Sequence, residues 1–119
     1  MKNVLIVDDS RTSRRFLKDI LERAGYNVVG EAINGQEGFD EYVKLSPDIV
    51  TMDITMPQVD GIESLKLIKK FNPDAKVIMI TAAGQKEKMM EAVKFGAVEF
   101  ITKPFMEESV IAALRHCEN

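Results

Sequence analysis

Three carboxylates in this sequence stand directly after apolar runs. Asp8 and Asp9 follow the run from Val4 to Val7, and Asp53 follows the apolar run that begins after Asp48. Runs of β-branched and long apolar residues bounded by polar residues are typical of buried strands. Each carboxylate is therefore predicted at the carboxyl end of a strand, where open α/β sheets bind their ligands. A single Asp in such a place can also serve only as a helix cap.

Two more polar residues occupy the same kind of position. Thr81 follows the run Lys76 to Ile80, and Lys103 follows the run Val98 to Thr102. Because the carboxyl ends of parallel strands meet at one edge of a sheet, all these side chains are expected around one shallow depression. Clustered carboxylates repel one another unless a cation neutralises them, and oxygen ligands without nearby His or Cys favour Mg²⁺ over zinc.

This set of residue types suits a phosphoryl group. A carboxylate can act as a nucleophile that forms an aspartyl phosphate, and Asp53 is placed for that role. Lys103 supplies a compact, mobile positive charge, and Thr81 supplies a hydroxyl donor. Positioning and charge neutralisation are most of what phosphoryl transfer requires.

The elements that must position these residues alternate along the chain. Strands are predicted at 4–7, 28–32, 48–53, 76–80 and 98–102, and a helix with one apolar face follows each strand. A βαβ alternation with right-handed crossovers builds an α/β, doubly wound, five-stranded parallel sheet. The runs 4–7, 49–52 and 77–80 are the most continuously apolar, so they are expected in the centre. The resulting strand order is 2-1-3-4-5, the flavodoxin-like arrangement.

The apolar faces of the five helices are predicted from helical spacing. In chain order they comprise Phe16, Leu17, Ile20, Leu21 and Ala24; Phe39, Tyr42 and Val43; Ile62, Leu65, Ile68 and Phe71; Met89, Met90 and Val93; and Met106, Val110, Ile111 and Leu114.

Composition bounds the remaining possibilities. The chain has 119 residues, 45% of them hydrophobic and 29% charged, which predicts one domain over 1–119 without an output domain. A net charge of −3 gives no general attraction to nucleic acid or to an anionic membrane. No apolar run reaches the length of a membrane span, and the first residues do not form a signal peptide. The single Cys117 cannot form an internal disulfide, and together with the other features this favours a cytoplasmic location. The chain is also expected to be a monomer.

Four motifs together give the sequence a family resemblance. They are Val-Asp-Asp-Ser at 7–10, Met-Asp-Ile-Thr-Met-Pro at 52–57 with Gly61, Thr-Ala-Ala at 81–83, and Lys-Pro-Phe at 103–105. The chain resembles the receiver domains of two-component response regulators, and within them the stand-alone chemotaxis regulators of the CheY type. The resemblance implies a CheY-like fold and a switched binding module that catalyses only its own phosphorylation and dephosphorylation.

By this resemblance, Asp53 accepts a phosphoryl group from a histidine kinase of the chemotaxis type. Mg²⁺ would be held by Asp9, Asp53 and the backbone carbonyl of Thr55, while Asp8 helps through water. Lys103 would pair with the phosphoryl group. The peptide bond between Lys103 and Pro104 is expected to be cis, a form that only an X–Pro bond adopts cheaply.

The resemblance also implies an output route. Thr81 would move toward the phosphoryl group, and the aromatic switch position is Phe100, where Tyr is common. A flagellar motor switch protein would dock on the face formed by the fourth helix, the fifth strand and the fifth helix, and a phosphatase would end the signal. The residues expected on that face are Lys86, Met89, Phe100, Thr102 and Met106. Thr55 and Ala83 occupy variable positions beside the phosphoryl group, which leaves the dephosphorylation rate open.

Other functions compete with this interpretation. A phosphorelay intermediate would pass the phosphoryl group to another histidine protein. A phosphatase of the haloacid dehalogenase type also uses an aspartyl nucleophile, but it needs a second Asp where Thr55 stands. A flavin-binding domain would need a hydroxyl-rich loop where Asp8 and Asp9 stand. The nearby Arg11, Arg14 and Arg15 are open to two interpretations, a solubilising helix face or a docking site for a kinase or phosphatase.

Overall fold

The computed structural model describes residues 2–56 and 58–118. Pro57, which the sequence places in the loop after the third strand, lies outside the described residues. Within them the five strands are β1 (Asn3–Val7), β2 (Asn27–Ala32), β3 (Ile49–Asp53), β4 (Val77–Thr81) and β5 (Glu99–Thr102). Each strand begins and ends at the predicted residue or one residue away from it.

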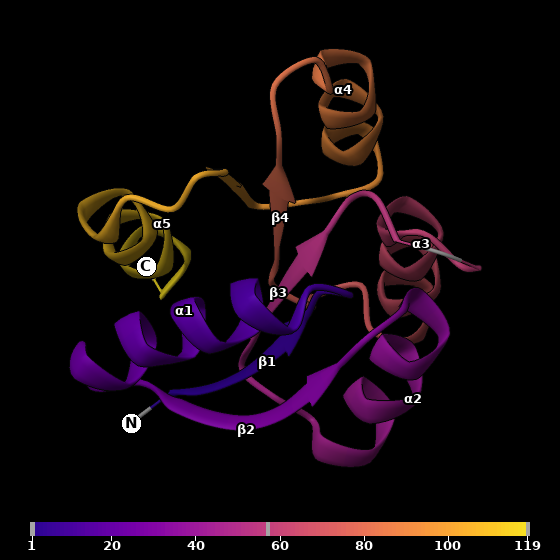
Figure 1. Cartoon of the computed structure of the whole chain (residues 1–119). Helices are drawn as coiled ribbons and strands as arrows, with labels where there is room; N and C mark the ends of the chain where they lie inside the picture. Colours follow the sequence, from indigo (N-terminus) through magenta and orange to yellow (C-terminus); the bar gives the residue numbers. More distant parts are fainter. Residues whose placement is uncertain (1, 57, 119) are drawn as a thin grey trace.

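All strand pairs are parallel, and the order in the sheet is β2-β1-β3-β4-β5 (Figure 1). The central strands β1, β3 and β4 are almost fully buried, whereas β2 and β5 carry partly exposed residues at the edges. The register between β1 and β2 shifts after Val4. The predicted fold class and strand order are therefore confirmed.

In the same described residues, five helices connect and cover the strands. They are α1 (Arg11–Arg23), α2 (Gly35–Leu45), α3 (Gly61–Phe71), α4 (Lys86–Lys94) and α5 (Glu107–Glu118). Three of them begin at an N-cap residue, Ser10, Asn34 or Asp60, whose side chain accepts a hydrogen bond from a backbone N–H in the first turn. None of the helices in the described part of the chain is long and apolar enough to cross a membrane.

The helices form two layers, one on each face of the sheet. Helices α1 and α5 lie together on one face, and α2 and α3 lie on the other (Figure 1). Alternate residues of each central strand point into the two layers, so Leu5 and Val50 join the α2–α3 side while Ile6 and Ile49 join the α1–α5 side. Burial on both faces fixes the central strands and with them the residues at their carboxyl ends.

Several residues of the predicted helical faces are exposed, and that part of the prediction is wrong. The exposed ones are Phe16 (53%), Val43 (41%), Phe71 (56%), Met90 (64%), Val93 (58%) and Met106 (65%). Helical spacing shows which residues share a side of a helix, but the buried stripe is narrower than the apolar one. Helix α4 instead packs through Ala92 and Met89, and Met106 precedes α5.

Candidate functional site

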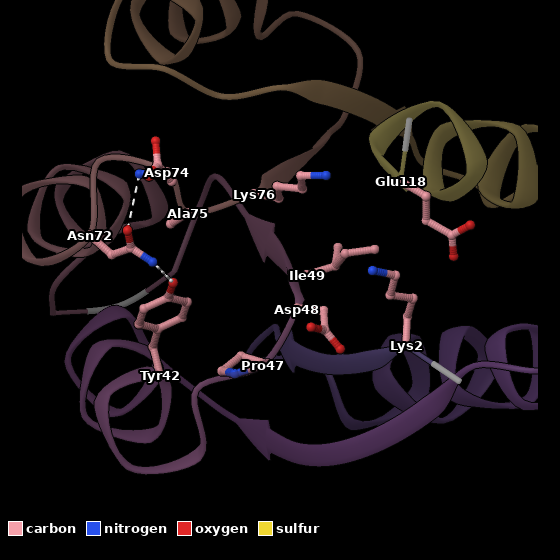
Figure 2. A pocket seen from close by; sticks show the side chains of 10 residues that line it. All are labelled: Lys2, Tyr42, Pro47, Asp48, Ile49, Asn72, Asp74, Ala75, Lys76 and Glu118. Carbon is pink, nitrogen blue, oxygen red and sulfur yellow. Dashed lines mark hydrogen bonds between the residues drawn. The ribbon is translucent and has the colours of Figure 1, made fainter.

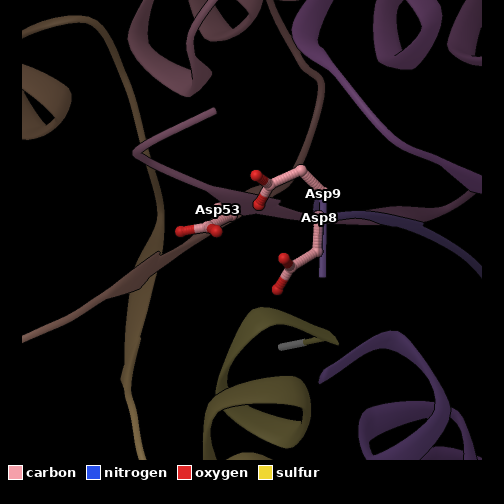
Figure 3. A group of neighbouring side chains, drawn as sticks. All are labelled: Asp8, Asp9 and Asp53. Atoms are coloured by element: carbon pink, nitrogen blue, oxygen red, sulfur yellow. The ribbon is translucent and has the colours of Figure 1, made fainter. Parts of the chain in front are cut away.

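The three carboxylates predicted at strand ends do meet at one edge of the sheet. Asp8 follows β1, and Asp53 is the last residue of the neighbouring strand β3. Asp8, Asp9 and Asp53 each offer a carboxylate oxygen within 4.8 Å of the other two (Figure 3). Asp8 is 1% exposed and Asp53 is 8% exposed, whereas Asp9 lies on the surface.

The buried Asp8 has two oxygens in different environments. Its Oδ1 accepts a hydrogen bond of 2.8 Å from the backbone N–H of Ser10, which holds the turn into α1. Its Oδ2 is buried and forms an ion pair with Lys103, whose Nζ lies 3.0 Å away. This ion pair offsets part of the cost of burying the Asp8 charge.

Lys103 reaches the carboxylates from the end of β5. Its Nζ lies 3.0 Å from Asp8 Oδ2 and 3.5 Å from Asp53 Oδ2, where it donates a hydrogen bond. Its backbone N–H donates to Thr81 O over 2.7 Å, which joins the chain after β5 to the end of β4. The Lys103–Pro104 peptide bond is cis, as expected.

Burial and the neighbouring charges shift two pKa values at this site. The pKa of Asp53 is raised from 3.8 to about 6, mainly by burial and also by the negative charge of Asp8, while Lys103 acts in the opposite direction. Burial by itself lowers the pKa of Lys103, but hydrogen bonding and attraction from Asp8 and Asp53 outweigh it, so the net shift is upward. Lys103 therefore stays charged at neutral pH.

A hard divalent cation fits this set of donors. Three carboxylates supply oxygen atoms only, and together they carry more negative charge than the ammonium of Lys103 offsets. Mg²⁺ commonly binds through a few carboxylates and keeps several waters, which leaves room for a phosphoryl oxygen. The triad is able to bind a metal ion.

The loop after β3 returns tightly to the strand end. The backbone N–H of Gly61 donates to Ile54 O over 2.8 Å. A Cβ atom added at Gly61 would come within 2.0 Å of Asp53 O and 2.8 Å of the Cα of Ile54. Only glycine allows α3 to begin this close to Asp53.

The structure places Arg14 in a role that neither interpretation of the basic cluster anticipated. Its Nη1 donates to Asp8 O over 2.8 Å, and its Nε donates to Glu31 over 3.0 Å. Arg14 thereby ties the end of β1 to the edge strand β2. Arg11 and Arg15 remain exposed on α1.

Sequence reasoning missed one residue beside the site, Gln85. Its side chain donates to Thr55 Oγ1 over 2.5 Å and accepts from the backbone N–H of Ala82 over 2.6 Å. These contacts join the loop after β3 to the loop after β4. Gln85 is the only long polar side chain in the segment 82–85, and that is the one sequence signal that would have singled it out.

The residues predicted for the switch and for partner binding occupy several environments. Thr81 is 2% exposed at the end of β4, opposite Thr102 of β5 in the register. Phe100 and Met89 are half-buried and pack against the α2–α3 side of the core. Lys86, Thr102 and Met106 are exposed.

A separate hollow of about 230 Å³ lies at the opposite end of the sheet (Figure 2). It is bordered by residues that precede strands, among them Lys2, Asp48 and Lys76, and by the hydrogen-bonded pair Asn72 and Tyr42. It contains none of the predicted site residues. Asp8, Asp9, Asp53, Thr81 and Lys103 lie instead at or just after the carboxyl ends of the strands.

Known proteins resemble this chain over nearly its full length. A family model for the response regulator receiver domain matches residues 4–115. The chemotaxis protein CheY of Thermotoga maritima is 53% identical over 113 residues, covering 95% of this chain and 94% of the relative. CheY of Bacillus subtilis is 46% identical over 116 residues, covering 98% and 97%.

A solved structure also resembles this chain over nearly its full length. The crystal structure of the CheX–CheY complex with beryllofluoride and Mg²⁺ from Borrelia burgdorferi matches with a TM-score of 0.95 and 38% identity, over 99% of this chain and 90% of that one. The chain therefore belongs to the response regulator receiver domains, and within them to the chemotaxis regulators of the CheY type, which are signalling proteins that phosphorylate and dephosphorylate only themselves.

Proposed function

We propose that Asp53 is the phosphoacceptor of this receiver and that a histidine kinase of the chemotaxis type is its phosphodonor. One observation carries this proposal: the Asp53 carboxylate, 8% exposed, lies at a strand end with Asp8, Asp9 and the Lys103 ammonium within reach. The 8% exposure leaves Asp53 open to a donor at the sheet edge, while its burial keeps it positioned.

The transfer makes one bond and breaks another. A carboxylate oxygen of Asp53 bonds to the phosphorus of a phosphohistidine while the phosphorus–nitrogen bond breaks. The electron pair of the broken bond stays on the imidazole, and the product is an aspartyl phosphate. Lys103, 3.5 Å from Asp53 Oδ2, is placed to neutralise the charge of the phosphoryl oxygens.

Mg²⁺ is the proposed cofactor. Asp9, Asp53 and the backbone carbonyl of Thr55 would hold it, with Asp8 contributing through water. When bound, it would offset the repulsion between the carboxylates and the incoming phosphoryl group. The excess of carboxylates over the ammonium of Lys103 supports this assignment.

The proposed output passes through Thr81 and Phe100. If Thr81 is drawn toward the phosphoryl group, it leaves space into which the half-buried ring of Phe100 on the adjacent strand can turn. Burying a Phe side chain contributes roughly 1.5–3 kcal/mol, the same scale as typical allosteric couplings. A flagellar motor switch protein would then bind the face that includes Lys86, Met89, Phe100, Thr102 and Met106.

The chain is further proposed to act in the cytoplasm as a monomeric, stand-alone receiver over 1–119. The matches to the two CheY relatives span 94% and 97% of those proteins, which supports a receiver without an output domain. A phosphatase is a further proposed partner, in line with the CheX–CheY complex of Borrelia burgdorferi.

Partner affinity with and without beryllofluoride and Mg²⁺ tests the output. The affinity for the motor switch protein should rise roughly 5- to 150-fold on beryllofluoride loading. Phe100→Ala should still become phosphorylated on Asp53 but should lose most of that gain. An unchanged gain in Phe100→Ala would contradict the switch, and fast transfer of the phosphoryl group to a second histidine protein would favour the phosphorelay alternative.

A further inference from the structure

Gln85 makes two side-chain hydrogen bonds that span the edge of the phosphoacceptor site. One end reaches the backbone N–H of Ala82, the residue directly after Thr81, over 2.6 Å. The other reaches Thr55 Oγ1, two residues after Asp53, over 2.5 Å. We call this pair of contacts the Gln85 latch. It joins the two loops that leave the neighbouring strands β3 and β4.

The chemistry of the partners fixes the orientation of the amide. A backbone N–H can only donate, so the atom that faces Ala82 must be the amide oxygen of Gln85. The amide nitrogen therefore faces Thr55 and donates to its hydroxyl oxygen. Both hydrogen-bonding ends of one side chain are thus used across two loops.

The latch takes the place of an ordinary helix cap. Gln85 is the N-cap residue of α4, yet its side chain makes no hydrogen bond to the first turn of that helix. Ala82, Ala83 and Gly84 are exposed, and Gly84 has a φ of +85°. Within residues 2–56 and 58–118, no other side-chain hydrogen bond holds this loop.

We propose that Gln85 is a positioning residue whose latch opposes activation, because it anchors Ala82 and so resists the movement of Thr81. The inference rests on the proposed function, in which Thr81 shifts toward a phosphoryl group on Asp53. Such a shift carries the peptide group between Thr81 and Ala82 with it and must break or stretch the bond to Gln85. A hollow of about 560 Å³, bordered by Thr55, Gly84 and Gln85 among others, gives the released amide room to turn away.

The latch makes a signed prediction about phosphomimic binding. Gln85→Ala should tighten the apparent affinity for beryllofluoride at saturating Mg²⁺ by roughly two- to tenfold, the range that corresponds to a net hydrogen bond. Phosphorylation by phosphoramidate should also be faster in Gln85→Ala than in the wild type. Thr55→Val should tighten the affinity for beryllofluoride by no more than Gln85→Ala does. The double variant with both changes should bind beryllofluoride as tightly as Gln85→Ala alone.

A control variant and an independent readout separate a latch from a general effect on folding. Lys88→Ala changes an exposed residue of α4 and should match the wild type. Amide hydrogen exchange gives a readout without any phosphoryl chemistry, because the Ala82 N–H should exchange faster in the metal-free Gln85→Ala protein.

The outcomes distinguish the latch from the function on which it rests. Faster Ala82 exchange with tighter beryllofluoride binding in Gln85→Ala supports the proposal. If the wild type binds beryllofluoride, two results for Gln85→Ala overturn the latch. One is unchanged exchange of the Ala82 N–H, and the other is faster exchange with unchanged or weaker beryllofluoride binding. A wild-type protein that binds no beryllofluoride contradicts the phosphoacceptor assignment itself, and the latch proposal is overturned with it.

Discussion

The ammonium of Lys103 lies 3.0 Å from Asp8 Oδ2, closer than the 3.5 Å that separates it from Asp53 Oδ2. Asp8 is 1% exposed, so this lysine is the main counter-charge of a buried carboxylate as well as a neighbour of the phosphoacceptor. Lys103 thus has a structural role before any phosphoryl group arrives.

Lys103→Met should destabilise the metal-free protein. The variant keeps most of the aliphatic stem but leaves the buried Asp8 carboxylate without its donor, which we expect to lower the free energy of unfolding by about 1–3 kcal/mol. Urea denaturation in EDTA at pH 7 measures this loss. Arg23→Met removes a cation from the exposed pair with Glu107 and should cost less than about 1 kcal/mol. Equal losses in the two variants would contradict the role of Lys103.

The stability of the metal-free protein should fall as the pH rises from about 4 to about 6. The pKa of Asp53 is raised from 3.8 to about 6 in the folded protein, so in this range the folded state binds a proton that the unfolded state has released. The free energy of unfolding therefore decreases with rising pH, by no more than about 3 kcal/mol for this group.

Denaturation in EDTA at several pH values checks this slope. Asp53→Asn cannot titrate and should lose that part of the pH dependence. A wild-type slope that Asp53→Asn retains in full would show that another group is responsible.

Asp9→Ala should lose Mg²⁺ without losing the fold. We expect the wild type to bind Mg²⁺ in the micromolar-to-millimolar range, on the order of 4–8 kcal/mol. Asp9 is exposed and repels two neighbouring carboxylates, so its removal should leave the metal-free thermal stability equal or higher. Calorimetric titration with Mg²⁺ measures the affinity, and the same affinity in Asp9→Ala would exclude this residue as a ligand.

Gly61→Ala should disturb the end of β3. The new Cβ would come within 2.0 Å of Asp53 O, and a backbone atom cannot yield as a flexible side chain does. We expect a loss of about 2–4 kcal/mol in the free energy of unfolding. Gly25→Ala is the matched control, because its Cβ would meet no atom within 4 Å although its φ is +92°. That control should cost only about 1–2 kcal/mol, and the reverse ranking would contradict the packing argument.

The sequence predicted the site better than it predicted the helix surfaces. The convergence of Asp8, Asp53 and Lys103 follows from the alternation of strands and helices alone, since parallel strands bring their carboxyl ends to one edge. Phe71 and Met90 were placed on buried faces but are 56% and 64% exposed. Spacing defines the direction of a side chain around its helix, whereas the width of the buried stripe depends on how the helix is docked.

Contacts that depend on loop conformation were beyond sequence reasoning. The Gln85 latch requires two loops to take particular paths, and no residue spacing encodes the approach of Gln85 to Thr55. The hydrogen bond from Arg14 to Asp8 O likewise depends on how α1 leaves β1. The residue types were visible in the sequence, but their partners were not.

Intact mass after treatment with phosphoramidate and Mg²⁺ tests the central claim most directly. The wild type should gain one phosphoryl group, and Asp53→Asn should gain none while keeping its circular dichroism spectrum. Asp74→Asn changes an exposed acid at the opposite end of the sheet and should gain one phosphoryl group like the wild type. Stoichiometric labelling of Asp53→Asn, or a wild type that stays unmodified, would contradict the assignment of Asp53 as the phosphoacceptor.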